Sequence, residues 1–297
     1  NSGTGDCQGS CRGAQLMGQW DAWIGRTEER LDRIDPALVR RWLATLDRDA
    51  AAEGFVPQGL HWCLCLPDAA TAQLGVDGHP IRDASPSSFL PPVPLPRRMW
   101  ASSTVDFLAP LRVGADVIRR STVQSVTQKE GASGTLVFVD VGHETISDGA
   151  LAVREVQSLV YREAALPDAP LAPPVQDGRF DPSGWAAHRP VTPGEALLFR
   201  FSALTFNSHR IHYDLPYAQA EERYRGLVVH GPLTATLLLD LVQRELGDNA
   251  LSSFRFRGLS PAICGEALHL VMRKGEEGMA LAAFAADGRQ IMAAQAQ

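Results

Sequence analysis

The sequence has no run of eighteen apolar residues, little cysteine and no excess of basic charge. A chain without such a run is predicted not to span a membrane. A formal net charge of −6 argues against a general nucleic-acid-binding protein, which presents a basic surface. The first residues, NSGTGDCQGSCRGAQ, lack an apolar core and so do not resemble a signal peptide. With 45% hydrophobic and 21% charged residues, the composition is that of a globular protein.

The five cysteines do not have the spacing of a metal site. Cys63 and Cys65 alternate within a short apolar run, and no second close pair accompanies them. We therefore expect buried, reduced thiols and no bound metal. Reduced cysteines indicate a cytoplasmic protein.

The N-terminal half is predicted to be a helix followed by a sheet. Residues 1–19 are small and polar, and we expect them to be flexible. Within residues 20–162, helical periodicity over 20–50 precedes four β-rich runs between 99 and 162. Consecutive strands without intervening helices favour an antiparallel sheet, and the helix at 35–48 can cover one of its faces.

The C-terminal half repeats this layout. Seven prolines make residues 163–194 the expected linker. In residues 195–297, a strand over 196–206 is followed by a short helix over 215–225 and a strongly apolar helix over 230–246. Four strand candidates close the chain: 251–258, 265–273, 279–286 and 289–295. The predicted fold class is therefore α+β.

Polar side chains crowd the segment SALTFNSHRIHYD, where a long apolar run stops. Asn207, His209 and His212 all fall within it. Imidazole has an unperturbed pKa of about 6.5, so it can accept and donate protons near neutral pH. The segment is thus the first candidate for a catalytic site.

Two motifs carry a resemblance to a known family. FSALTFNSHRIHYD and the later YRGLVVHGPLTATLLL resemble the MaoC-like acyl-CoA hydratases and dehydratases. Within them, they are most similar to the branch of 3-methylfumaryl-CoA (mesaconyl-C4-CoA) hydratase, itaconyl-CoA hydratase and the mitochondrial-type 3-hydroxyacyl-thioester dehydratases. WIGRTEE, FLPPVPLPRRMW and GTLVFVDV extend the resemblance over nearly all of the chain after residue 20.

The resemblance implies a double hot-dog fold, in which each half wraps an antiparallel sheet around a helix. It places the active site in the C-terminal half and leaves the N-terminal half without a catalytic motif. It further implies a coenzyme A thioester as substrate and no dissociable cofactor. The sequence leaves open whether the chain acts alone or as a homodimer.

The family motif is an Asp, then a His five residues later, with an Asn between them. His212 keeps the place of the family His, whereas Asn207 replaces the Asp and His209 replaces the Asn. An amide does not accept a proton at neutral pH as a carboxylate does. The two-residue acid–base mechanism of the family therefore does not carry over unchanged.

Three roles follow for enoyl-thioester hydration. His212 is the predicted general base in hydration and general acid in dehydration. Asn207 would orient the water. The N–H of Gly231, at the positive start of the apolar helix, is the predicted donor to the thioester oxygen, with Leu233 N–H as a second donor.

Further residues are candidates for contact with the substrate. Arginine binds phosphate or carboxylate through its planar fork, and SSFRFRGLSP places two arginines on one face of a strand. The candidates are His209, His230, Arg98, Arg225, Arg255 and Arg257, with Arg97 beside Arg98. The remaining histidines lie in no motif: His61, His79, His143, His188 and His269.

The predicted function is reversible hydration of a short branched or dicarboxylic enoyl-CoA, such as mesaconyl-C4-CoA or itaconyl-CoA. A 3-hydroxyacyl-thioester dehydratase of fatty-acid metabolism is an alternative, and it predicts a deep apolar tunnel. The missing carboxylate favours a second alternative, a non-catalytic acyl-CoA-binding protein. A hot-dog thioesterase fits the motif pair less well.

Overall fold

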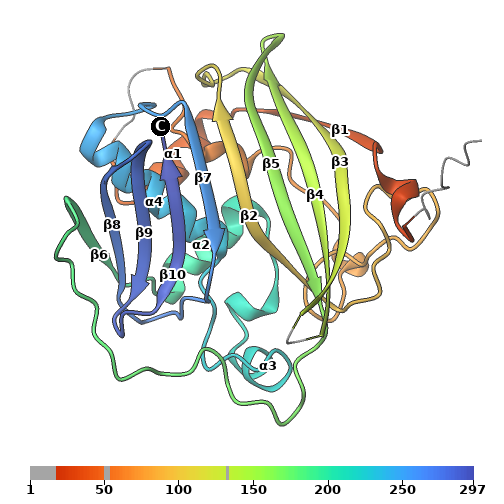
Figure 1. Ribbon diagram of the computed structural model, residues 1–297. Coiled ribbons are helices and arrows are strands. Elements are labelled where there is room, and N and C mark those ends of the chain that lie inside the picture. The colour runs from red at the N-terminus through yellow and green to blue at the C-terminus, as the bar shows by residue number, and fades with distance from the viewer. Residues whose placement is uncertain (1–17, 50–53, 132–133) are drawn as a thin grey trace, which may run out of the picture.

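One antiparallel sheet of ten strands runs through the molecule, in the order β1-β3-β4-β5-β2-β7-β10-β9-β8-β6 (Figure 1). The computed structural model describes residues 18–49, 54–131 and 134–297. Most of the segment predicted to be flexible, residues 1–17, lies outside this range. Residues up to Arg162 supply the first five strands of the order, and residues from Ala187 onward supply the other five.

The strands are β1 (Thr27–Arg33), β2 (Arg97–Phe107), β3 (Asp116–Gly131), β4 (Gly134–Ser147), β5 (Ala150–Arg162), β6 (Ala187–Val191), β7 (Ser253–Gly258), β8 (Leu268–Gly275), β9 (Gly278–Ala285) and β10 (Gln290–Ala296). The α-helices are α1 (Pro36–Thr45), α2 (Glu195–Thr205), α3 (Leu215–Ala220) and α4 (Gly231–Leu246). The 3-10 helices are η1 (Asp21–Trp23), η2 (Leu60–Cys63), η3 (Thr71–Gln73) and η4 (Arg210–His212). None of the helices in the described ranges is long and apolar enough to cross a membrane.

The two half-sheets join where β2 pairs with β7 (Figure 1). Ser102 lies opposite Arg257, and Asp106 lies opposite Ser253. Beside this seam, the rings of Trp62 and Phe256 pack edge to face, with centroids 5.8 Å apart. The inner surfaces of both halves therefore meet in one continuous region.

Helix α4 is the buried helix that the sequence predicts over 230–246. Its N-cap residue is His230, and it ends before Gly247, whose φ of 95° a side chain would disfavour. Leu233 and Leu238 are completely buried. The helix contacts β8 and β9 of the C-terminal half-sheet. Because its sequence is apolar on nearly every side, burial is its main source of stability.

A buried carboxylate connects α4 to its surroundings. Asp240 is 1% exposed and accepts hydrogen bonds from Arg189 on β6 at 2.7 Å and Arg244 at 2.8 Å. Arg48, from the N-terminal half, lies 3.6 Å away. Removing a carboxylate from water is costly unless it is paired. These arginines therefore connect the helix with β6 and with the N-terminal half.

The strand predicted over 196–206 is wrong, because this segment forms helix α2. Its buried residues Leu198, Phe201 and Leu204 recur at a spacing of three, which places them on one helix face. The helix ends at Phe206, which takes the left-handed conformation with a φ of 48°. The polar cluster thus follows a helix.

Three further boundaries differ from the prediction. Within the segment predicted as helical over 20–50, β1 forms an edge strand against β3, and its residues alternate between exposed and half-buried, as in a half-exposed strand. Helix α3 is shorter than 215–225, and the side chain of Asp214 caps its start. The linker over 163–194 contains β6, which pairs with β8. The eight other predicted strands are confirmed as β2 to β5 and β7 to β10.

The buried face of α4 predicts a large and local cost of truncation. Leu238→Ala should lower the free energy of unfolding by about 2–5 kcal/mol, because it leaves a cavity in the core. Leu246→Ala is the matched control, since Leu246 ends the same helix and is 46% exposed. Chemical denaturation measures both. Equal losses in the two variants would contradict the described packing of α4.

Candidate active site

A cavity of roughly 1800 Å³ is lined by residues of both halves. Its wall includes the start of β2, the loop before it, the segment after α2 and the first residues of α4. The predicted catalytic residues Asn207, His212 and Gly231 all line it, as do His209 and His230. Small-molecule pockets usually measure about 300–1,000 Å³, so this cavity has room for an extended ligand.

The chain after α2 folds into a turn that orients the polar cluster. The side-chain oxygen of Asn207 accepts a hydrogen bond from the backbone N–H of His209 at 3.0 Å. This is an Asx turn, which asparagine favours. The amide NH₂ of Asn207 is the part of the side chain left to bind a ligand or a water molecule.

His212 has a defined tautomer. Its Nδ1 lies 2.7 Å from the carbonyl oxygen of Val228. A carbonyl only accepts, so Nδ1 carries the hydrogen and Nε2 keeps its lone pair. Burial, helped by the neighbouring His230, holds the pKa of His212 well below its ordinary value. The ring is therefore neutral at pH 7 and can act as a base through Nε2.

The ring of His230 packs against the ring of His212. The two rings are stacked with centroids 3.5 Å apart and an interplanar angle of 19°. His230 Nε2 lies 2.8 Å from the Ser202 hydroxyl. Burial, followed by the charge of His209, lowers the pKa of His230 to about 3. Two neutral imidazoles thus lie side by side at the start of α4.

Gly231 begins α4 and lines the same cavity as His212. Its N–H has no acceptor within the helix, because the first amides of any helix lack one. A Cβ at this position would approach the protein no closer than 3.9 Å, at the carbonyl oxygen of Trp100. The protein itself therefore does not require glycine here, and the missing side chain leaves the amide accessible from the cavity.

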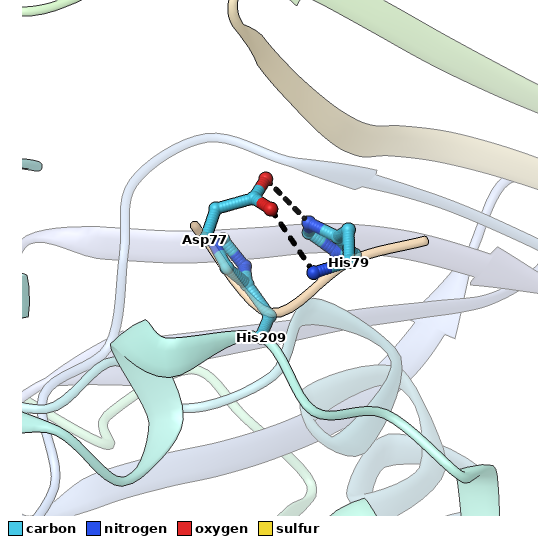
Figure 2. Close-up of side chains that lie close together, drawn as sticks. All are labelled: Asp77, His79 and His209. Carbon is cyan, nitrogen blue, oxygen red and sulfur yellow. Dashed lines mark hydrogen bonds and ion pairs between the residues drawn. The ribbon is translucent and has the colours of Figure 1, made fainter. Parts of the chain in front are cut away.

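Two further residues of the site, Asp77 and His79, were not predicted from the sequence. They lie in the loop of the N-terminal half that precedes β2. The rings of His79 and His209 pack at a tilt of 36° with centroids 4.1 Å apart, and the rings of His209 and His212 are perpendicular with centroids 5.6 Å apart. Figure 2 shows Asp77 bonded to His79, with Nδ1 to Oδ2 at 3.0 Å. Four imidazoles thus form a row along the cavity, and Asp77 lies at its outer end.

Close packing holds this loop against the polar segment. The backbone N–H of Arg210 donates to the Asp77 carbonyl at 2.9 Å, and the Ser208 hydroxyl donates to the Gly78 carbonyl at 2.6 Å. A Cβ at Gly78 would collide with the Ser208 carbonyl oxygen, and its φ is 85°. Only glycine fits there. The position of His79 against His209 is therefore built into the backbone.

The predicted arginines divide into two groups. Arg98 lines the cavity, and no carboxylate of the described residues lies within ion-pair distance of it. Arg97 also lines the cavity but pairs with Glu222 at 2.6 Å.

The other predicted arginines do not line the cavity. Arg225 is held by both oxygens of Glu266. Arg255 and Arg257 are exposed on β7, which buries the alternate residues Phe254 and Phe256 on its other face. The prediction that they share a strand face is confirmed, but that face points away from the core. Their assignment to substrate binding has no support from this arrangement.

A second polar cluster lies on the inner face of the N-terminal half. Glu155 is 5% exposed and accepts hydrogen bonds from Ser103 at 2.5 Å and Trp62 at 3.2 Å. His61 Nε2 lies 3.5 Å from the same carboxylate. Burial alone would raise the pKa of Glu155. The hydrogen bond and the charge of His61 outweigh burial and bring this pKa below its ordinary value. The N-terminal half therefore carries polar groups that the sequence motifs did not reveal.

One group of side chains has the composition of a metal site. The donor atoms of Asp77, His79 and His209 lie within 4.8 Å of one another (Figure 2). Two imidazoles and a carboxylate are donors that several transition metals accept. The hydrogen bond between Asp77 and His79 satisfies two of these donors without an ion.

Fold and site together define a class of protein. A neutral imidazole and the first amide of a buried helix line one cavity, in a ten-stranded sheet built from two halves. This agrees with the class that the sequence motifs resemble, the hot-dog enzymes that add water to, or remove it from, an acyl thioester.

Comparison with known proteins assigns the family. The model of the hydroxyacyl-thioester dehydratase type 2 family matches residues 59–264. The chain is 42% identical to mesaconyl-C4-CoA hydratase of Chloroflexus aurantiacus over 278 residues, covering 93% of this chain and 96% of the relative. The protein belongs to the hydroxyacyl-thioester dehydratase type 2 family, within the MaoC-like hot-dog enzymes, and is a hydro-lyase.

Solved structures support the fold. A MaoC-like dehydratase from Phytophthora capsici aligns with a TM-score of 0.66 at 13% identity, covering 92% of this chain and 95% of that one. A Mycobacterium tuberculosis protein with a double hot-dog fold aligns with a TM-score of 0.59 at 13% identity, again covering 92% and 95%. The predicted double hot-dog is confirmed.

The buried row predicts a pH dependence of stability. As the pH falls below the ordinary histidine value of 6.5, the unfolded chain binds a proton at residue 230, while folded His230 stays neutral until about pH 3. The free energy of unfolding therefore falls over this window, by about 1.4 kcal/mol per pH unit for this residue. Denaturation of wild type and His230→Gln between pH 7.5 and 5 measures the difference. The variant should lose less stability on acidification than the wild type, because it lacks the group that the unfolded chain protonates. Parallel curves for His230→Gln and wild type would contradict a neutral buried His230.

Proposed function

We propose that this protein catalyses the reversible hydration of a short, carboxylate-bearing enoyl-CoA, of which mesaconyl-C4-CoA is the first candidate and itaconyl-CoA the second. The observation that supports it most is the shared cavity of His212 and Gly231. The relative of 42% identity, a mesaconyl-C4-CoA hydratase, supports the substrate class.

The mechanism follows from the free groups on the cavity wall. The N–H of Gly231 binds the thioester oxygen and stabilises the negative charge that grows there, an effect worth about 3–4 kcal/mol for one good donor. His212 Nε2 takes a proton from water as the oxygen bonds to the β-carbon. The side-chain NH₂ of Asn207 donates to that water and holds it for attack. In dehydration the same groups act in reverse.

Arg98 supports a dicarboxylic substrate. It lines the cavity with no carboxylate partner among the described residues. Its positive charge contributes to the lowered pKa of His79 in the imidazole row. A guanidinium binds a carboxylate bidentately. The free carboxylate of the acyl group is the natural anion for this position.

One polar patch on the wall of the N-terminal half favours a short, polar acyl group. The cavity is lined largely by apolar side chains, but this patch is polar: His61, His143, Thr145, Glu155 and Gln157. Burying a methylene chain against such groups strips them of water without replacing their hydrogen bonds. A short, polar acyl group fits this surface better.

Turnover by wild type and His212→Gln tests the reaction. The wild type should hydrate mesaconyl-C4-CoA, and His212→Gln should lose about 10²–10⁴-fold in kcat, because a positioned general base contributes that much. His188→Gln is the control, at an exposed site outside the cavity wall. Tight binding without turnover by the wild type would favour the acyl-CoA-binding alternative instead.

Selectivity tests the role of Arg98. Arg98→Met should lower kcat/KM for mesaconyl-C4-CoA and itaconyl-CoA by about tenfold or more, since a hydrogen bond to a charged group contributes about 1.5–3 kcal/mol. The value for crotonyl-CoA, which lacks the carboxylate, should change little. Arg120→Met, whose native side chain pairs with Glu29 on the surface, is the control. An equal loss on all three substrates would refute carboxylate binding by Arg98.

A further inference from the structure

The imidazole row presents a problem of charge. His212 and His230 are buried and have no carboxylate bonded to a ring nitrogen. An imidazolium formed on His212 is therefore disfavoured as soon as water gives up its proton. Asn207, in the place of the family carboxylate, cannot take that proton. The reaction needs a second group that holds a proton at low cost.

His79 is the member of the row with a hydrogen-bonded carboxylate, whereas the carboxylate nearest to His209, that of Glu222, lies 3.8 Å from His209 Nε2. The Nδ1 of His79 lies 3.0 Å from Asp77 Oδ2, and a carboxylate only accepts, so Nδ1 carries the hydrogen and Nε2 is free. Burial alone would raise the pKa of Asp77. The hydrogen bonds and the charge of His79 outweigh burial and bring this pKa to about 2. Asp77 is thus ionised throughout the neutral range and stabilises a positive charge on His79.

We propose that Asp77 and His79, supplied by the N-terminal half, are the second acid–base group of this active site and replace the carboxylate that is absent at position 207. The inference rests on the proposed function. It assigns a chemical role to the half of the chain that has no catalytic motif.

The proton balance is as follows. In hydration, the water oxygen bonds to the β-carbon, its proton passes to His212 Nε2, and the electron pair of the double bond moves toward the α-carbon. The proton moves from His212, through cavity water and His209, to His79 Nε2, where Asp77 compensates the charge. The α-carbon takes one proton from the row. One water is added, and the row returns to its starting charge.

Other charged groups around His79 set its resting state. Burial lowers the pKa of His79 below its ordinary value, and the charges of His209 and Arg98 act in the same direction, against the hydrogen bond that His79 donates to Asp77 and the charge of Asp77. The resting ring is therefore neutral and ready to accept a proton. The groups that face this pair are Arg98 on β2, Arg82 in the preceding loop, His209 after α2, Tyr217 on α3 and Glu222 after α3.

The same side chains fit a metal ion less well. Both oxygens of Asp77 already accept hydrogen bonds from His79, one from the ring and one from the backbone N–H. The rings of His79 and His209 are tilted by 36° with centroids 4.1 Å apart, so each ring already packs against the other. The nearby charge of Arg98 also repels a cation. The acid–base pair is therefore the better assignment, and the experiment below includes an outcome that would show a metal ion instead.

Asp77→Asn removes the negative charge at residue 77 while keeping the turn around it. The Asn side chain keeps the oxygen that accepts from the His79 N–H, so the turn is preserved. We expect kcat for mesaconyl-C4-CoA to fall about tenfold or more with KM within about threefold, as for loss of an acid–base group. The limb of the pH–kcat profile that belongs to His79 should move to lower pH by about 1–3 units, because its anionic partner is lost.

The matched control is Asp181→Asn. Asp181 forms the same kind of turn, accepting from the Ser183 N–H at 2.8 Å, but does not line the cavity. It should leave kcat and the pH profile unchanged. His79→Ala should lose activity that added imidazole partly restores, which a purely structural role would not allow.

Each outcome decides between the accounts. Wild-type kcat and pH profile in Asp77→Asn and His79→Ala, with His212→Gln inactive, would refute this inference and leave the proposed function intact. A wild type without turnover on any of the enoyl-CoAs would refute both. Activity lost to a chelator and restored by Zn²⁺, with one ion bound per chain in the wild type and none in His79→Ala, would replace the acid–base pair by a metal site.

Discussion

The pairing of β2 with β7 is the constraint on which the site depends. It joins two half-sheets into one, so that a loop of the first half lies against the polar segment of the second (Figure 1). Without the seam, Gly78 would have no Ser208 carbonyl to pack against, and His79 would have no His209. The cavity wall is made by both halves for the same reason.

Burial gives the site its chemical character. A buried imidazole loses its hydration and becomes neutral, and the Val228 carbonyl then decides which nitrogen of His212 carries the hydrogen. The start of α4 supplies the complementary property, a backbone N–H with partial positive charge. His212 and Gly231 thus bring a lone pair and a donor to the wall of one cavity, and the proposed hydration uses both. A charged histidine in this position would hold its proton and could not activate water.

Much of this architecture could be predicted from the sequence, and the failures have physical causes. The apolar helix α4 and eight strands follow from hydrophobic periodicity, and His212 and Gly231 follow from the two motifs. Helix α2 was mistaken for a strand because its short apolar run has no polar face that would reveal the period. Strand β1 was mistaken for a helix because charged residues are good helix formers until an edge of a sheet pairs with them.

The missing part of the site depends on contacts that no local pattern encodes. Asp77 and His79 lie far along the chain from His209, and only the folded backbone brings them together. Arg255 and Arg257 were correctly placed on one strand face, but which face is buried is decided by packing of Phe254 and Phe256. Motifs locate chemistry within a segment, whereas charge partners across the fold come from tertiary structure.

A crystal structure with a saturated thioester analogue of the acyl-CoA, which keeps the thioester oxygen but has no double bond to hydrate, tests the central claim most directly. The account predicts the thioester-equivalent oxygen within about 3 Å of the Gly231 nitrogen and a water within about 3 Å of His212 Nε2, on the side of the β-carbon. An acyl group bound elsewhere in the cavity, with His212 and Gly231 in contact only with solvent, would contradict it.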